Sequence, residues 1–290
     1  MSIVWTHKPI GWSPKDCVDE YRRSTGKTDK VAFAGRLDPM AYGLLPLVIN
    51  GNRESSTILE NQYKTYKFKV ILGITTDTYD ILGLIQDIKL NFILNKEEIQ
   101  RLLHDCSQIT NQEYPPYSSK TVYDEVTGKQ TQLWKLANMG RLPTILPIHE
   151  VNIEYLKLLK NKVVSGEELI SKVNIRINSL SKSKDMRKEA ILNDWNRRFR
   201  FESNIVQLCS SKECYENELK NNRFQIITCE ARVSSGTYIR GLANMMGGTC
   251  FDINRVGYGS INVDNTDKFQ LRSRTMFDSK RNRKSCFATF

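Results

Sequence analysis

Two distant segments with alternating side chains set the first limit on how this chain can fold. Residues 65–72 (TYKFKVIL) and 224–233 (FQIITCEARV) alternate roughly with the two-residue period of a half-buried strand. Segments with helical patterns lie between and after them, without a regular succession of strand, helix and strand. Parallel βαβ folds require that succession, so the sequence predicts the α+β class.

Capping signals mark where helices begin and end. Ser13 before Pro14 is typical of an N-cap followed by proline at the first helical position. Asn95 with Glu98 three residues later has the pattern of a capping box. We expect helices over 14–25, from Asn95 through Leu103, over 133–139 and over 237–246, two charged helices between 166 and about 199, and a short strand over 81–85.

The charge balance predicts a polyanionic partner. The 290 residues carry 43 basic and 32 acidic side chains, a net charge of +11, and the pI is about 9.3. Nucleic acid is the commonest polyanion bound by such proteins, but an excess of lysine also occurs on solvated faces. Composition alone leaves both explanations open.

Targeting and metal signals are weak. No run approaches the ~18 apolar residues of a membrane-spanning helix, and the first residues lack the pattern of a signal peptide. We therefore expect a cytoplasmic protein without membrane contact. Seven scattered cysteines and three separated histidines predict free buried thiols and no metal site.

Two polar positions stand out from their surroundings. Asp38 lies between Leu37 and Pro39, ahead of the apolar run LLPLVI, where it fits either a simple turn or a carboxylate at the mouth of a cleft. Arg240 lies in the first turn of the helix predicted over 237–246, where the helix dipole disfavours a cation that has no anionic partner. Arg240 is then either a surface side chain or the partner of a carboxylate such as Asp38.

Five sequence blocks, in order along residues 7–250, resemble the TruB-type tRNA pseudouridine synthases. HKPIGWS is similar to the family's Lys-Pro-x-Gly-x-Ser start, and AGRLDPMAYGLLPL to its Leu-Asp-Pro signature. KTYKFKVILGITTDTYD is similar to its tyrosine-bearing strand and Thr-Asp-x-x-Asp turn, QEYPPYSSK to its Pro-Pro-x-Tyr-Ser block, and VSSGTYIRGLA to its Gly-Thr-Tyr-Ile-Arg motif. Five blocks in the family's order make the match specific.

The resemblance implies a fold and an activity. The fold would be the pseudouridine synthase catalytic fold, with a mixed, mostly antiparallel central sheet, flanking helices and an RNA-binding cleft. The reaction would convert uridine to pseudouridine, typically at position 55 of the tRNA T-loop, without any cofactor. A monomer acting on tRNA or another structured RNA is the corresponding expectation.

The resemblance also assigns roles to residues. Asp38 falls on the catalytic aspartate, acting as nucleophile or as base at the sugar, and Arg240 on the arginine that pairs with it. Tyr66 matches the tyrosine that stacks under the target base and serves in proton transfer. Without the family, Tyr66 would be a plain core aromatic. Asp80 is expected to support the site, and Tyr238 belongs to the arginine motif.

The sequence departs from the family at two positions. Arg36 stands where a small residue usually precedes Leu-Asp, and a Gly-Arg-Leu-Asp sequence occurs in sister families that act on ribosomal RNA. Phe33 stands where the family carries histidine, so it can stack on a base but cannot donate a hydrogen bond. These departures motivate the alternative, a catalytically weak RNA-binding protein or RNA folding chaperone of the same fold.

We expect the catalytic domain to cover residues 1–270 and a basic tail to cover 271–290, with no separate C-terminal RNA-binding domain. The charged helices at about 166–200 are predicted to be an insertion on the surface that could take over part of the contact with RNA. Eight basic residues are expected either to contact the phosphate groups of RNA or to lie on a solvated surface: Lys8, Arg36, Lys64, Lys67, Lys280, Arg281, Arg283 and Lys284.

Overall fold

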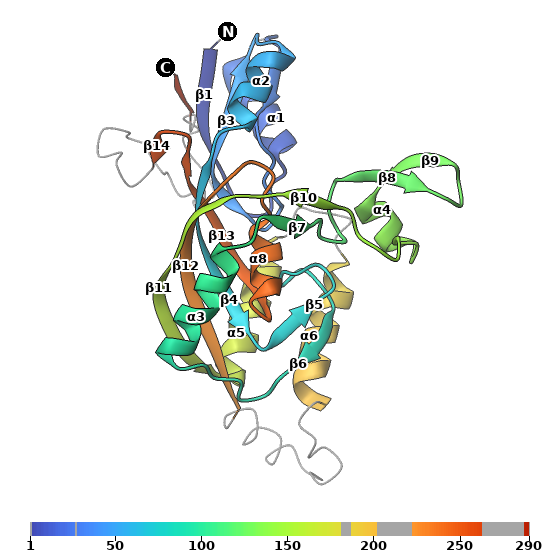
Figure 1. Ribbon diagram of the computed structural model, residues 1–290. Coiled ribbons are helices and arrows are strands. Elements are labelled where there is room, and N and C mark those ends of the chain that lie inside the picture. Colours follow the sequence, from blue (N-terminus) through green and yellow to red (C-terminus); the bar gives the residue numbers. More distant parts are fainter. Residues whose placement is uncertain (1, 27, 181–186, 202–221, 263–286, 290) are drawn as a thin grey trace, which may run out of the picture.

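A long curved sheet is the frame of the molecule (Figure 1). The computed structural model describes residues 2–26, 28–180, 187–201, 222–262 and 287–289. Within these ranges the largest sheet has nine strands. In order across the sheet they are β11 (Ile153–Ser165), β12 (Arg223–Val233), β4 (Lys64–Leu72), β13 (Gly248–Tyr258), β3 (Tyr42–Ile49), β1 (Ser2–Lys8) and β15 (Phe287–Thr289), with β14 (Ile261–Asn262) beside β13 and β2 (Val31–Phe33) beside β3.

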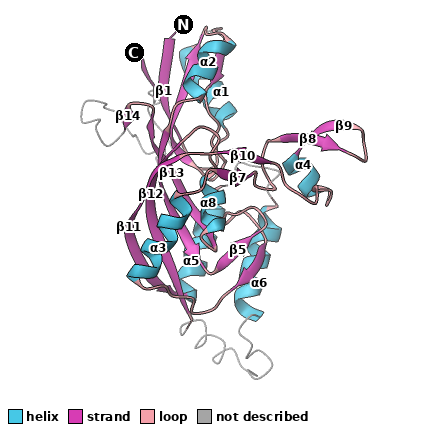
Figure 2. Ribbon diagram, in the orientation of Figure 1, coloured by secondary structure: helices cyan, strands magenta, loops and turns pink. Residues whose placement is uncertain are grey.

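The sheet is mixed but mostly antiparallel. β13 and β3 run parallel, with Asn254 opposite Tyr42 and Arg255 opposite Gly43, and the other neighbouring strands run antiparallel. Helices lie beside this layer instead of alternating regularly with its strands (Figure 2). The α+β class and the mixed central sheet predicted from the sequence are therefore confirmed.

Every predicted helix has a counterpart in the structure, which within the described residues adds one helix, Arg53–Glu60, that was not predicted. The structure has α1 (Pro14–Thr25), α2 (Arg53–Glu60), α3 (Lys96–Ser107), α4 (Leu133–Asn138), α5 (Gly166–Asn178), α6 (Lys188–Phe201) and α8 (Ile239–Met245). Both α1 and α3 begin with complete capping boxes, at Ser13 with Asp16 and at Asn95 with Glu98. The helix predicted from residue 237 begins two residues later, with Tyr238 as its N-cap.

The strand predicted over 81–85 is wrong. The short hairpin here is β5 (Ile74–Thr76) with β6 (Ile85–Ile88), and residues 77–84 form the turn between them. The carboxylates of Asp77 and Asp80 accept hydrogen bonds from the backbone N–H groups of Leu84 and Leu82, at 2.8 and 2.9 Å. This local side-chain bonding holds a turn where the apolar pattern alone indicated a strand.

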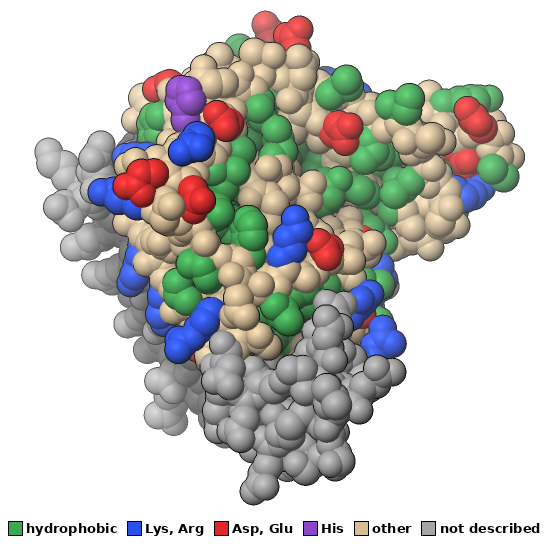
Figure 3. Space-filling view, turned by 60° about the horizontal axis from the view of Figure 1, so that its bottom comes forward, with side chains coloured by type: hydrophobic (Ala, Val, Ile, Leu, Met, Phe, Trp, Pro, Cys, Tyr) green, Lys and Arg blue, Asp and Glu red, His purple; other side chains and the backbone are tan. Residues whose placement is uncertain are grey.

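An arm projects from the body of the molecule. It consists of the hairpin β8 (Thr121–Asp124) and β9 (Lys129–Gln132) followed by α4, and it stands out to the right in Figures 1 and 3. A second small pair, β7 (Asn111–Glu113) with β10 (Ile148–Glu150), lies at its base. Apolar side chains on and next to the arm, such as Val126 and Ile145, are exposed.

One large apolar core joins the sheet to its helices. Phe68 and Val70 on β4 are fully buried, and Ile99 of α3 and Leu242 of α8 belong to the same core. Trp195 of α6 is also fully buried in it. The charged helices α5 and α6 are thus packed into the body, whereas the sequence predicted a surface insertion.

Candidate active site

The loop that carries Asp38 connects β2 to β3. The backbone N–H of Ala41 donates to the carbonyl of Asp38 at 3.0 Å, so residues 38–41 form a tight turn. Asp38 therefore lies in a turn, and this position is compatible with its being a carboxylate of the site. Beyond the turn, Gly43 has a φ of 110°, and a Cβ there would lie 2.3 Å from the carbonyl oxygen of Arg255. Only glycine permits β3 to approach β13 this closely.

Two buried cations hold the loop by its carbonyls. Lys8 is fully buried, and its Nζ donates to the carbonyl oxygens of Ala41 at 2.5 Å, Pro39 at 3.4 Å and Pro9 at 3.1 Å. Burial lowers the pKa of Lys8 to about 8. Lys8 was expected either to contact RNA phosphates or to lie on a solvated surface. Both expectations are wrong, because its ammonium group is buried and donates to carbonyl oxygens inside the protein.

Arg255 holds the other side of the same loop. Its guanidinium donates to the carbonyl oxygens of Leu44 at 2.7 Å, Arg36 at 3.2 Å and Gly35 at 3.4 Å, and its side chain is buried. These bonds leave the loop backbone little freedom around Asp38. Arg255 was not predicted as a site residue, because it lies in an ordinary strand and outside the five recognised blocks.

The ion pair predicted between the two distant motifs is present. Arg240 Nε donates to Asp38 Oδ2 at 2.9 Å; the side chain of Arg240 is 3% exposed and that of Asp38 is 36% exposed. Arg240 is therefore not a surface side chain. The carboxylate of Asp38 is paired on one side and open to solvent on the other, which is the state required of a reactive carboxylate.

Arg240 binds three separate segments. Besides Asp38, its Nη1 donates to the carbonyl of Thr78 at 2.7 Å and its Nη2 to the carbonyl of Tyr117 at 3.0 Å. Asp38 therefore receives a single hydrogen bond from Arg240, because the other two guanidinium nitrogens donate to these carbonyls. Burial lowers the pKa of Arg240, and the carboxylates of Asp38 and Asp80 raise it by more, so its net shift is upward.

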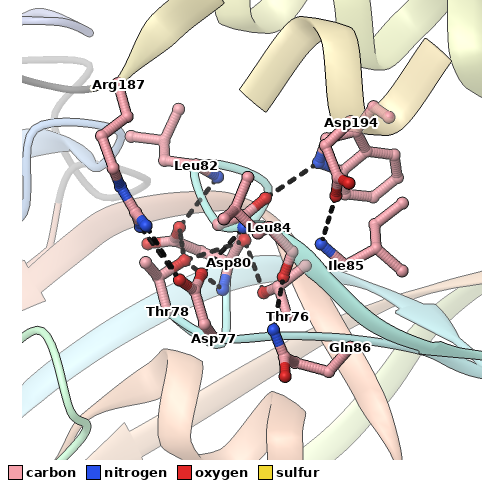
Figure 4. A network of polar contacts seen from close by, with 12 residues as sticks. Thr76, Asp77, Thr78, Asp80, Leu82, Leu84, Ile85, Gln86, Arg187 and Asp194 are labelled. Carbon is pink, nitrogen blue, oxygen red and sulfur yellow. Dashed lines mark hydrogen bonds and ion pairs between the residues drawn. The ribbon is translucent and has the colours of Figure 1, made fainter. Parts of the chain in front are cut away.

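Asp80 supports this arrangement from the turn at 77–84 (Figure 4). Its Oδ1 accepts hydrogen bonds from the Thr78 hydroxyl at 2.7 Å and from the N–H of Leu82. Burial raises the pKa of the Asp80 carboxyl to about 6, while the charge of Arg240 acts to lower it. Asp80 thus shapes the turn whose Thr78 carbonyl binds Arg240, and it adds negative charge near that arginine.

Tyr66 and Tyr238, the two tyrosines predicted as site residues, lie on different elements. Tyr66 is a buried side chain of β4, opposite Ala231 of β12 and Arg255 of β13. Tyr238 caps α8, and its ring lies 5.6 Å from the guanidinium carbon of Arg240. The structure therefore places Tyr238 beside the ion pair, and Tyr66 on the strand next to Arg255, which holds the Asp38 loop.

Gln112 is a second residue that sequence reasoning missed. Its buried side chain accepts a hydrogen bond from the N–H of Tyr238 at 2.8 Å and donates to the carbonyl of Tyr238 at 3.1 Å. A Cβ at Gly241 would lie 2.8 Å from Gln112 Nε2, so a larger residue there would displace the Gln112 side chain. Gln112 is the first residue of the QEYPPYSSK block, and this position could have indicated a role in the site.

The remaining predicted residues have different surroundings. Arg36 is exposed on the loop, and Phe33 at the end of β2 is half buried against the main core. Lys64 is buried, donates to the carbonyl of Glu60 and lies over the ring of Tyr258, so the expectation of a phosphate contact or solvated surface at Lys64 is also wrong. Burial lowers its pKa to about 7. The tail residues Lys280, Arg281, Arg283 and Lys284 lie outside the described residues.

Within the described ranges, no helix is long and apolar enough to cross a membrane, and no group of three or more His, Cys, Asp or Glu side chains is placed to hold a metal ion. The four cysteines in those ranges, Cys17, Cys106, Cys229 and Cys250, are buried free thiols.

Comparison with known proteins gives a consistent set of relatives. The family model described as "TruB family pseudouridylate synthase (N terminal domain)" matches residues 22–181. The chain is 32% identical over 160 residues to tRNA pseudouridine synthase B of Thermotoga maritima, covering 52% of this chain and 49% of that protein. It is 38% identical over 138 residues to the protein of the same name from Caldicellulosiruptor saccharolyticus, covering 48% and 45%.

The chain thus spans about half the length of the curated relatives it matches. Among solved structures, the crystal structure of a Cbf5–Nop10–Gar1 complex overlaps with 90% of this chain and 50% of the other chain, at a TM-score of 0.49 and 12% identity.

Proposed function

Because this chain belongs to the TruB family of pseudouridylate synthases, we propose that it isomerises uridine to pseudouridine in tRNA, at the T-loop uridine of position 55. The observation that carries the proposal is the ion pair between Asp38 and Arg240. It joins two residues 202 positions apart, both of which fall on the family's motifs. A pure RNA-binding protein has no need of a carboxylate that is anchored by an arginine and still 36% exposed.

The proposed chemistry is balanced without any added reagent. The N1–C1′ bond of uridine breaks, the base turns, and a C5–C1′ bond forms while the proton on C5 is lost and a proton is gained at N1. Asp38 acts at the sugar, as nucleophile or as base. Arg240 binds and orients that carboxylate, and Tyr66 is the proposed group for stacking on the base and for proton transfer at C5.

Reaching a uridine inside a folded loop requires the base to leave its stack, at a cost of a few kcal/mol. Base stacking and phosphate contacts must offset that cost. We propose Arg36, exposed on the loop itself, as one such contact, and Phe33 as a residue that affects the choice of uridine. The buried free thiols suit a reducing compartment, and we place the reaction in the cytoplasm, carried out by a monomer.

The test is release of tritium from tRNA labelled at uridine C5. The wild-type protein should release one tritium for each modified uridine, and Asp38→Asn should release none while binding tRNA within a few-fold of wild type. A tRNA in which the position-55 uridine is replaced by cytidine tests the site. Binding without tritium release by the wild type would support the alternative of a silent RNA-binding protein, and turnover by Asp38→Asn would refute the role of Asp38.

A further inference from the structure

The helices α5 and α6 belong to an insertion at the tip of a hairpin. Strands β11 and β12 pair as far as Ser165 opposite Arg223, and the N–H of Gly166 donates to the carbonyl of Asn222 at 3.1 Å. The hairpin could close at that point with a short turn. The helices α5 and α6 are therefore not needed for the pairing of these strands, and another role must explain their packing into the core.

The insertion is anchored to the turn at 77–84 (Figure 4). Trp195 Nε1 donates to the carbonyl of Gly83 at 3.1 Å, and Asp194 Oδ2 accepts from the N–H of Ile85 at 2.8 Å. Both contacts come from the middle of α6, and Trp195 is fully buried. α6 thus has a fixed position on the β5–β6 hairpin that does not depend on its first turn.

Arg187, just before α6, binds two segments of the site at once. Its Nη1 and Nη2 each lie 3.1 Å from Asp77 Oδ2, and its guanidinium carbon lies 4.6 Å from the centre of the Tyr117 ring. Asp77 is held in turn by the N–H of Leu84 on its other oxygen. The guanidinium therefore connects the turn at 77–84 to the segment around Tyr117.

These are the two segments whose carbonyls bind Arg240. Thr78, next to Asp77, accepts from Nη1 of Arg240, and Tyr117 accepts from Nη2. We propose that Arg187 is a positioning residue for the proposed isomerisation. It keeps the two carbonyls at the spacing that directs Nε of Arg240 to Asp38. In this chain the hairpin-tip insertion supplies a brace for the catalytic ion pair.

The competing role for Arg187 is a phosphate contact, since its side chain is 30% exposed. The two roles predict different kinetics. Displacing a catalytic group by about 1 Å can cost ~10²-fold in rate without changing substrate affinity. Loss of a phosphate contact weakens binding and lowers the slope of log affinity against log salt by about one.

The experiment compares Arg187→Ala with Lys188→Ala, which removes the same charge one residue later. Lys188 makes one long hydrogen bond, to the carbonyl of Asn178 at 3.4 Å. We expect Arg187→Ala to lower the single-turnover rate of tritium release by about 10- to 100-fold, with tRNA affinity and its salt slope within twofold of wild type. Lys188→Ala should leave the rate unchanged. Arg187→Lys should recover part of the rate, because an ammonium group can still pair with Asp77.

A double-mutant cycle tests whether Arg187 acts through Asp77. Asp77→Asn keeps an oxygen for the N–H of Leu84 and removes the charge that Arg187 binds. If the proposal is right, Arg187→Ala with Asp77→Asn is little slower than either single variant. Losses that multiply, or weaker tRNA binding with an unchanged single-turnover rate, would overturn it.

A readout independent of activity separates this inference from the proposed function. If the wild type releases no tritium, the function fails first, and amide hydrogen exchange still tests the brace. The N–H groups of Leu82 and Leu84 should exchange at least fivefold faster in folded Arg187→Ala than in Lys188→Ala. Equal exchange in the two variants would refute the brace.

Discussion

Arg240 uses its three guanidinium nitrogens on three different segments, the Asp38 loop, the turn at Thr78 and the segment at Tyr117. A lysine has a single nitrogen on a flexible stem and cannot hold all three in a planar arrangement. We expect Arg240→Lys to lose nearly as much single-turnover activity as Arg240→Ala, about 10²-fold or more, with tRNA affinity little changed. Tritium release and filter binding measure the two effects. A lysine variant within threefold of wild type would contradict this prediction.

The buried carboxyl group of Asp80 should make the stability of the folded protein depend on pH. Burial raises its pKa to about 6, whereas an unfolded aspartate titrates near 3.8. Between these values the folded protein holds more protons than the unfolded one, so the stability contributed by Asp80 is present at pH 4 and is lost as the pH rises to about 7.

Asp80→Asn should remove that pH dependence, because its oxygen can still accept from Thr78 and Leu82. The free energy of unfolding of Asp80→Asn minus that of wild type should increase by ~2–3 kcal/mol from pH 4 to pH 7. Urea unfolding at both pH values measures the difference. A difference that does not change with pH would show that ionising the buried carboxyl has no cost.

The loop at 34–41 is held in place by buried cations that donate to its carbonyl oxygens, and not by the regular hydrogen bonds of paired strands. Lys8 binds the carbonyls of Pro39 and Ala41, next to Asp38. Lys8→Met keeps the volume of the side chain and leaves those carbonyls without their donor, which should cost ~2 kcal/mol of stability. Because the loop then loses a constraint, turnover should fall about tenfold or more.

Salt dependence distinguishes this role from contact with RNA. Lys8→Met should leave the slope of log affinity against log salt unchanged, because the ammonium group is buried. Lys15→Met is the matched control, because it makes the same substitution at an exposed lysine: Lys15 lies on α1 with 79% of its side chain exposed. A lower salt slope for Lys8→Met would restore the phosphate role that its burial excludes.

At the scale of the whole molecule, the net charge of +11 overstates the charge available at the surface, because Lys8, Lys64, Arg240 and Arg255 are buried on internal partners. The remaining excess still predicts electrostatic binding. tRNA affinity should fall ~10³-fold or more between 50 and 200 mM salt if six or more phosphates are neutralised. Titrations at four salt concentrations give the slope, and a flat line would mean that the excess charge is only solvated surface.

The sheet also sets which parts of the chain meet at the site. Parallel pairing of β13 with β3 brings Arg255 against the end of the Asp38 loop, and antiparallel pairing of β12 with β4 carries the chain towards α8 and Arg240. Segments around residues 38, 78, 117 and 240 therefore converge although they are far apart in sequence. Arg187 reaches the same place from the insertion.

Much of the local structure was predictable because its causes are local. The N-cap signal of Ser13 and Pro14 and the capping box at Asn95 placed the starts of α1 and α3, and side-chain alternation placed β4 and β12. Motif recognition identified Asp38 and Arg240 as partners. Each of these signals lies within a few residues of the feature that it specifies, or within a block long enough to be recognised.

Only the tertiary structure decided which cations are buried and what they bind. Lys8, Lys64 and Arg255 look like surface residues in the sequence, because burial depends on which carbonyls and rings the fold brings to them. The same holds for the two carbonyls on Arg240 and for Arg187 on Asp77 and Tyr117. Backbone acceptors have no side-chain identity, so their convergence on a distant cation leaves no pattern in the sequence and appears only when the chain is folded.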